Sequence, residues 1–261
     1  RKAKLQKIIR ESMNELEQSG NYLGKLSAAQ SYATIAGTYS LLEDYENAIK
    51  YYAMYIPAIR EAIAEDFLLK SPKERELTWK RELTNIEEMN TMLALLPDNQ
   101  VLYSKLSQLI YDGQLLSKGI LLSSNVEFDK VLAYNGTDEM KMQYDKVKKN
   151  LELIASMKEQ RMPVDEILAL TRETDAIQLE LARKNAEFAD FMQYLRIESA
   201  NITEALDDDA VAIEFVTLNT DILTDEDMIV AVAVCKEFPS GIAIPVSYVK
   251  IVKGIIADSD K

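Results

Sequence analysis

The chain has 261 residues, of which 48% are apolar and 28% charged, a composition typical of a globular protein of one or two domains. Its formal net charge of −13 argues against nucleic acid and against an anionic membrane surface as partners, because both require a basic surface. The sequence contains no histidine and one cysteine, Cys235, which excludes Ser–His and Cys–His catalytic pairs, His-ligated metal sites and intramolecular disulfides.

The first 17 residues already carry apolar side chains at helical spacing. The sequence as it stands shows no signal-peptide pattern, and no apolar run in it reaches the roughly 18 residues that a membrane-spanning helix needs. Because the chain starts at Arg1, within this helical pattern, we expect it to be a piece of a longer protein.

Residues 26–67 predict two helices that meet at Glu43-Asp44. Aromatic residues are spaced to fill gaps between the two helices, and small residues are spaced to let them approach; the positions are Tyr32, Ile35, Ala36, Tyr39, Ala48, Tyr52 and Tyr55. This segment resembles a tetratricopeptide repeat, with an ordinary helical hairpin as the alternative.

Repeats of this kind bind peptides on the inner face of the first helix, so the resemblance implies a groove for a protein or peptide partner. Here that face would carry Gln30, Ala33, Gly37 and Ser40, whose mostly small side chains would leave space for a ligand. The alternative is that these four residues are simply exposed or pack against a preceding repeat that this chain lacks.

A further helix is predicted to begin at Ser71, because Ser71-Pro72-Lys73-Glu74 forms a capping box, and to end at Pro97-Asp98. Its expected apolar face consists of Trp79, Leu83, Ile86, Leu93 and Leu96. Trp79 is interpreted as a core anchor rather than a ligand platform.

The helix predicted over residues 99–124 is apolar nearly all round, which is typical of a buried helix. Gly113 and Gly119 lie inside it. A mid-helix glycine costs about 1 kcal/mol relative to alanine, so these two indicate a close approach of another element or a bend.

A heptad pattern of apolar residues covers two consecutive segments that are separated by a turn at Arg161-Met162-Pro163. It predicts an antiparallel coiled-coil hairpin with helices of about 20 and 30 residues. Thr137 is the expected N-cap of the first helix, while Thr174 and Lys184 interrupt the seam of the second.

Three strands are predicted after residue 197, over Ala210–Val216, Met228–Cys235 and Gly241–Val246. The first two are nearly continuous apolar runs, as expected of strands buried on both faces. Pro245 places the third strand at an edge. Since a small sheet with two open edges is incomplete, we expect downstream chain, local helices or another copy to cover it.

The acidic clusters Asp207–Asp209 and Thr224–Asp227 lack the spacing of a calcium loop and are interpreted as solvated. Cys235 has no histidine to lower its pKa and is interpreted as a buried small hydrophobe. The sequence therefore predicts neither a metal nor a cofactor.

The order of these parts resembles the CHAT domain family, caspase- and separase-like α/β domains that follow tetratricopeptide repeats. The resemblance rests on LIYDGQLLSKGILLSS at Leu109–Ser124, FLLKSPKERELTW upstream, ITEALDDDAVAIEFV downstream and the strands of Met228–Val246. It implies either a caspase-like parent protein, of which this chain is the amino-terminal part, or a shortened, non-catalytic relative. Proteases of this family use a His/Cys pair on later strands. Neither member of that pair is assignable here.

We therefore expect a mostly α protein: tetratricopeptide-like hairpins, a long coiled-coil-like hairpin and a small incomplete α/β sheet, divided at 1–70, 71–197 and 198–261. The expected role is that of a non-catalytic interaction scaffold, with a protein or peptide partner and with self-association through the open sheet edge. A self-contained enzyme of unknown type and a purely structural helical protein are the alternatives.

Overall fold

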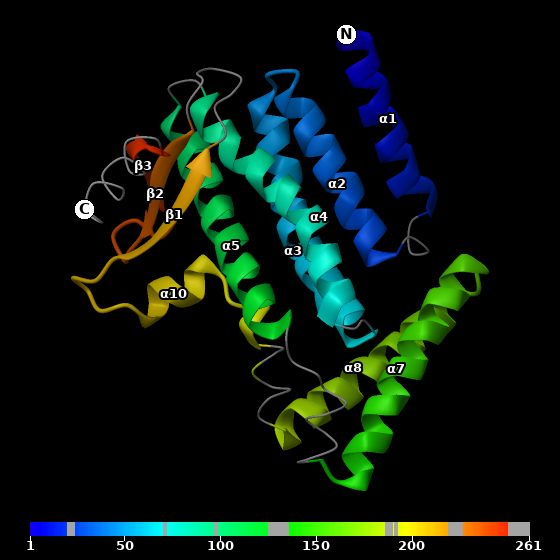
Figure 1. The fold of residues 1–261 in the computed structure, drawn as a ribbon. Helices are drawn as coiled ribbons and strands as arrows, with labels where there is room; N and C mark the ends of the chain where they lie inside the picture. Colours follow the sequence, from blue (N-terminus) through cyan, green and yellow to red (C-terminus); the bar gives the residue numbers. More distant parts are fainter. Residues whose placement is uncertain are drawn as a thin grey trace.

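The computed structural model is mostly helical and carries one small antiparallel sheet near its C-terminal end, as the sequence predicts. Helices α1 to α5 form a bundle, the sheet lies beside α5, and the hairpin of α7 and α8 lies across the other end of the bundle (Figure 1). The structure describes residues 1–19, 24–69, 72–96, 99–124, 136–185, 190, 193–218 and 227–249.

The first layer contains α1 (Lys2–Ser19), α2 (Lys25–Ser40) and α3 (Tyr45–Leu69). The predicted turn at Glu43-Asp44 is confirmed: Glu43 takes a left-handed conformation with φ 61°, and the backbone N–H of Asp44 donates to the carbonyl of Tyr39. Between α2 and α3 the ring of Tyr51 stacks on that of Tyr39, with centroids 5.7 Å apart. Aromatic side chains thus fill the space between these helices, while the assignment to a repeat family stays a prediction.

The second layer contains α4 (Pro72–Thr91), the short 3-10 helix η2 (Met92–Ala94) and α5 (Gln100–Ser124). One continuous hydrophobic core runs from Ala29 on α2 to Val234 in the sheet and passes through both layers. Trp79 is buried in it, which confirms its role as a core anchor. The proposed capping residue Ser71 lies outside the described residues.

The two glycines of α5 mark close approaches, as predicted. A Cβ on Gly119 would lie 2.4 Å from the carbonyl oxygen of Tyr194. A Cβ on Gly113 would lie 3.2 Å from the terminal methyl of Met89. Gly119 therefore allows the chain that leads to the sheet to cross directly over α5.

The long hairpin consists of α7 (Asp138–Glu159) and α8 (Val164–Lys184). Thr137 caps α7 as predicted, since its side chain accepts from the backbone N–H of Met140 at 3.2 Å. At the seam, buried Thr174 accepts a hydrogen bond of 3.1 Å from the side chain of Asn150. A single satisfied polar pair inside an apolar seam fixes the register of the two helices.

The prediction that the second helix of the hairpin has about 30 residues is wrong, because α8 ends at Lys184 after 21 residues. Asn185 is extended, with φ −134° and ψ 113°, and asparagine has a low helix propensity. The heptad position Leu195 is instead fully buried in the main core. Phe188 and Phe191, which belonged to the same pattern, lie outside the described residues.

The sheet has the order β1 (Ala212–Leu218), β2 (Met228–Val234) and β3 (Ile242–Tyr248), with both pairs antiparallel. Pro245 lies on the edge strand β3 as predicted, and the register shifts at Ile229/Val230, beside its pairing position. α4 and α5 cover one face, where Lys118 of α5 donates to Glu214 of β1 at 2.5 Å.

The prediction that the first strand is buried on both faces is wrong. Along β1, exposed Ile213, Phe215 and Thr217 alternate with inward-facing residues, whereas β2 is buried over Val230–Val234. A continuous apolar run predicts two buried faces only when something covers each face, and no described element covers the outer face of this sheet.

Candidate functional site

The four residues predicted to line a peptide groove lie along α2, where the chain itself covers much of their face. Gln30 donates a hydrogen bond of 3.1 Å to Glu82 on α4, and Ala33 is only 5% exposed. Gly37 faces the Glu88 carboxylate, and Ser40 is half-buried at the end of the helix. Among the described residues, α4 therefore occupies the place that a peptide would take at Gln30 and Gly37; binding of a peptide there stays a prediction.

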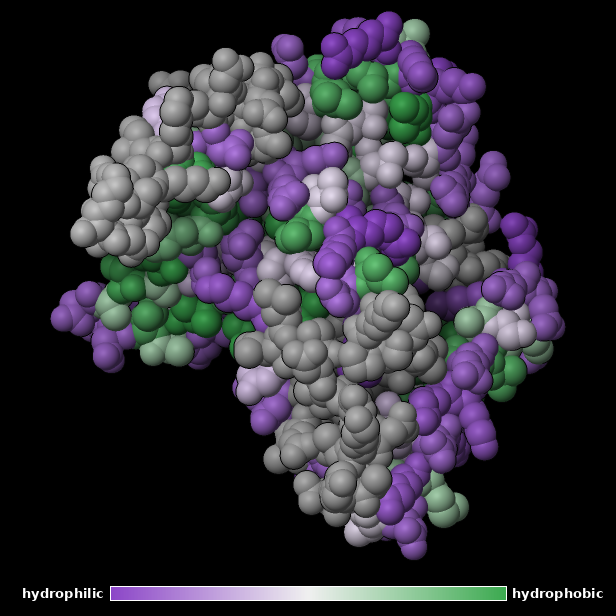
Figure 2. Space-filling model, in the orientation of Figure 1, coloured by the Kyte–Doolittle hydropathy of each residue, from purple (hydrophilic) through white to green (hydrophobic). Residues whose placement is uncertain are grey.

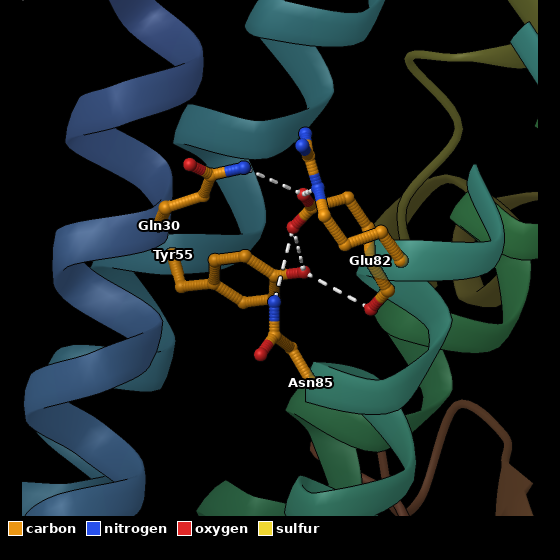
Figure 3. A network of polar contacts seen from close by, with 5 residues as sticks. Gln30, Tyr55, Glu82 and Asn85 are labelled. Carbon is orange, nitrogen blue, oxygen red and sulfur yellow. Dashed lines mark hydrogen bonds and ion pairs between the residues drawn. The ribbon is translucent and has the colours of Figure 1, made fainter. Parts of the chain in front are cut away.

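The buried carboxylate of Glu82 joins the helices α2, α3 and α4 at this place (Figure 3). The Glu82 side chain is 0% exposed. One of its oxygens accepts from Gln30 of α2 and from the exposed Arg81 guanidinium, each at 3.1 Å. The other oxygen accepts from Asn85 at 3.0 Å and from the Tyr55 hydroxyl of α3 at 3.3 Å. A buried carboxylate with this many donors is a structural clamp, because its negative charge is balanced and both oxygens are hydrogen-bonded.

Sequence reasoning missed this clamp, although a signal was present. The buried stripe of α4 runs through Trp79, Glu82, Ile86 and Met89 at helical spacing, and Leu83 is only half-buried. A glutamate on an apolar stripe indicates a buried charge that must have partners. Two of those partners, Gln30 and Tyr55, come from other helices, so they are not visible in the sequence of α4.

Two neighbouring tyrosines of α3 differ in how their hydroxyls are satisfied. Tyr55 donates to Glu82, whereas the buried Tyr52 hydroxyl has no hydrogen-bond partner among the described residues. Burial raises the pKa of both phenols above the ordinary value of 10.0, and nearby carboxylates add to the rise. Both hydroxyls are therefore held in the neutral form.

Tyr52→Phe is expected to leave the free energy of unfolding unchanged or to raise it by about 1 kcal/mol, because the mutation removes an unpaired buried hydroxyl. The matched Tyr55→Phe is expected to lower it by about 2 kcal/mol, because a hydrogen bond to a buried carboxylate is lost. Urea unfolding at neutral pH measures both. Equal effects of the two substitutions would contradict the difference in hydrogen bonding.

The raised pKa values of these two phenols also predict how the free energy of unfolding depends on pH in the alkaline range. Because the folded pKa of each phenol is raised, its contribution to stability is complete below pH 10 and is lost as the pH rises above that value. Each Phe variant is therefore expected to lose less stability between pH 9 and about 11 than the parent protein. Urea unfolding across this range provides the measurement.

The second candidate surface is the outer face of the sheet. Phe215 is 64% exposed and Ile244 is 49% exposed, and Ile213, Ile242 and Val246 are exposed beside them. Figure 2 shows hydrophobic side chains gathered over the sheet at the left of the view. We call this set of five residues the outer sheet face.

The strand register makes the outer sheet face continuous. Phe215 and Ile244 are both paired with Ala231 of the central strand, and Ile213 and Ile242 are both paired with Ala233. Small alanines in the middle strand lie between large side chains on the two edge strands. The result is a ribbed apolar surface, of the kind that packs against another layer of protein.

Other chemistry-bearing residues form no comparable site. Cys235 is half-buried at the end of β2, and exposed Asp208 pairs with Lys236 at 2.7 Å. Over the described ranges, no group of three acidic or cysteine side chains is placed to hold a metal ion, and no helix is long and apolar enough to cross a membrane. Residues 224–226 of the second acidic cluster lie outside the described residues.

Comparison with known proteins gives no relative for this chain. No protein-family model, no curated protein and no solved structure matches it.

Proposed function

We propose that this chain is a non-catalytic interaction scaffold, similar to the amino-terminal part of CHAT-type proteins, whose helices present a small sheet to a protein partner. The main observation in support of this proposal is the outer sheet face. Its exposed side chains include Phe215 and Ile244, two large apolar residues that normally lie inside a protein. Large contiguous apolar patches on a protein surface mark places where another protein binds.

The way in which the helices hold the sheet supports the scaffold role. Tyr103 of α5 donates to the carbonyl of Ala243 in β3 at 3.3 Å, and Lys118 of the same helix pairs with Glu214 in β1. One helix thus anchors both edge strands through their inner side. The outer face and the two edges are left for a partner, such as further strands of a caspase-like domain.

The composition supports a role without catalysis. The chain has no histidine, and therefore no imidazole to activate Cys235. A peptidase activity of the parent protein would follow from the CHAT resemblance alone. A purely structural helical protein is less favoured, because such a protein would not need a sheet with an exposed apolar face.

Sedimentation analysis tests this proposal on the purified chain. An exposed apolar face associates with its own copies when no other partner is present, so we expect the mass of the protein to rise with concentration. The double variant Phe215→Lys/Ile244→Lys is expected to stay monomeric. A matched control, Leu77→Lys/Met142→Lys, adds the same charge at exposed apolar positions on α4 and α7 and is expected to associate like the parent. Identical behaviour of the two double variants would overturn the proposal.

A further inference from the structure

A cleft of about 640 Å³ opens between α3, α8 and the segment that leads into α10 (Ser199–Ala205). Its apolar lining comes from Pro57 and Ala64 on α3, from Leu179 on α8 and from Leu195. The cleft lies apart from the outer sheet face, so what binds in it is independent of the scaffold role proposed above.

The lining of this cleft includes a buried cation. Arg60 of α3 is 7% exposed, and its Nη1 donates to the carboxylate of Glu198. Its Nε and Nη2 atoms are also buried but have no hydrogen-bond partner among the described residues. These two nitrogens form one complete edge of the planar guanidinium, with two parallel N–H groups.

The geometry of that edge selects a ligand. Two parallel N–H groups match the two oxygens of a carboxylate or phosphate in a bidentate arrangement, which is the strongest pairing that an arginine makes. A buried arginine with an unsatisfied edge is costly, so a ligand that satisfies it gains this energy on binding.

The surrounding charges distinguish between the two oxyanions. Glu198 is already paired with Arg60, and Asp112 lies close enough for the guanidinium to oppose the rise in its pKa that burial causes. A phosphate dianion would place two negative charges beside these carboxylates, whereas a carboxylate places one. The rest of the lining is mixed: its apolar side chains suit a hydrocarbon chain, and its further charged side chains are of both signs, with Lys25 and Arg196 as well as Glu61 and Asp175.

We propose that this cleft binds a carboxylate carried on a short apolar chain, with both carboxylate oxygens paired to the Nε–Nη2 edge of Arg60. The Nε and Nη2 atoms have almost no solvent contact, so lining side chains shift when the ligand enters. Leu179 and Arg196, both exposed at the cleft, have the freedom to do so. The carboxylate comes from a free acid or from the carboxyl end of a peptide.

Titration of ¹⁵N-arginine-labelled protein, monitored at the Arg60 Nε–H signal, tests the proposal. Hexanoate is expected to shift this signal saturably, while hexanamide and inorganic phosphate bind at least about tenfold more weakly. N-acetyl-alanyl-leucine, compared with its amide, represents the peptide source. Tighter binding of this peptide than of hexanoate would assign the cleft to peptide ends, and the reverse would assign it to free acids.

Three variants make the result decisive. Arg60→Lys keeps a positive charge beside Glu198 but has no counterpart of the Nε–Nη2 edge. We therefore expect hexanoate to bind this variant at least about tenfold more weakly. The shifts of backbone amide signals measure this binding. Arg172→Lys, an exposed arginine on α8, is the matched control and should bind normally. Leu179→Trp fills the cleft without changing Arg60, and decides the question if Arg60→Lys does not fold.

The proposal is overturned if hexanamide binds as tightly as hexanoate, or if Leu179→Trp leaves binding unchanged. It is also overturned if Asp112 satisfies the free edge in solution. In that case hexanoate leaves the Nε–H signal in place, whereas Asp112→Asn shifts it.

Discussion

Replacing Glu82 with alanine is expected to lower the free energy of unfolding by about 3 kcal/mol, because several donors lose one common acceptor. The buried Tyr55 hydroxyl would keep only the backbone carbonyl of residue 82 as an acceptor, the half-buried Asn85 amide would lose the carboxylate, and Gln30 would lose its link to α4. The helices α2, α3 and α4 would then lose the one side chain among the described residues that hydrogen-bonds to all three. Urea unfolding provides the measurement.

Two further variants at and near this position separate the clamp from a general effect of mutating α4. Glu82→Gln keeps the shape but turns an amide group toward donors, so an intermediate loss of about 1–2 kcal/mol is expected. Glu87→Ala, an exposed glutamate of the same helix, should change stability by less than about 0.5 kcal/mol. If Glu82→Ala is no more damaging than Glu87→Ala, then Glu82 does not clamp the helices.

Gly119→Ala is the second change with a large expected effect, about 2 kcal/mol of lost stability. The new methyl group would lie 2.4 Å from the carbonyl oxygen of Tyr194, which is backbone and cannot rotate away. The better helix propensity of alanine returns at most about 1 kcal/mol. The segment that carries Leu195 into the core would have to move away from α5.

Gly113→Ala on the same helix is the comparison for this prediction. Its methyl group would meet the flexible end of Met89 at 3.2 Å, and this side chain has other rotamers. The net change is expected to stay within about 1 kcal/mol, since slight overpacking is offset by the gain in helix propensity. Thermal or urea unfolding of the two variants in parallel shows whether backbone contact, rather than glycine as such, sets the cost.

The features that depend on neighbouring residues in the chain were predictable from the sequence. The turn at Glu43-Asp44, the cap at Thr137 and the edge position of Pro245 each follow from a local backbone requirement. The close approaches at the two glycines of α5 were only partly predictable in this way. Their presence indicated a close approach, but not that Tyr194 is the partner of Gly119.

The features that depend on distant residues were not predictable. Glu82 and Arg60 both lie on stripes that are mostly apolar. Glu82 accepts hydrogen bonds from Gln30 and Tyr55 on other helices, and Arg60 is paired with the distant Glu198. The exposure of the outer face of β1 was not predictable for the same reason. The sequence shows an apolar strand, whereas burial depends on which elements lie over it.

The two features most relevant to function lie on different parts of the molecule. The outer sheet face offers an apolar layer for a protein partner, and the cleft at Arg60 offers the bidentate donor edge of a buried guanidinium. The residues expected to line a groove on α2 lie largely beneath α4. This arrangement directs the search for a protein partner toward the sheet.

Backbone hydrogen exchange of the purified chain at low and high protein concentration tests most directly whether the sheet is the interaction surface. Amides of the edge strands β1 and β3 are expected to exchange more slowly as the concentration rises, because association covers the sheet. Amides of α2 around Gln30 and Gly37 should be unaffected. Concentration-dependent protection of α2, or of no segment at all, would contradict the proposal that this protein binds its partners through the sheet.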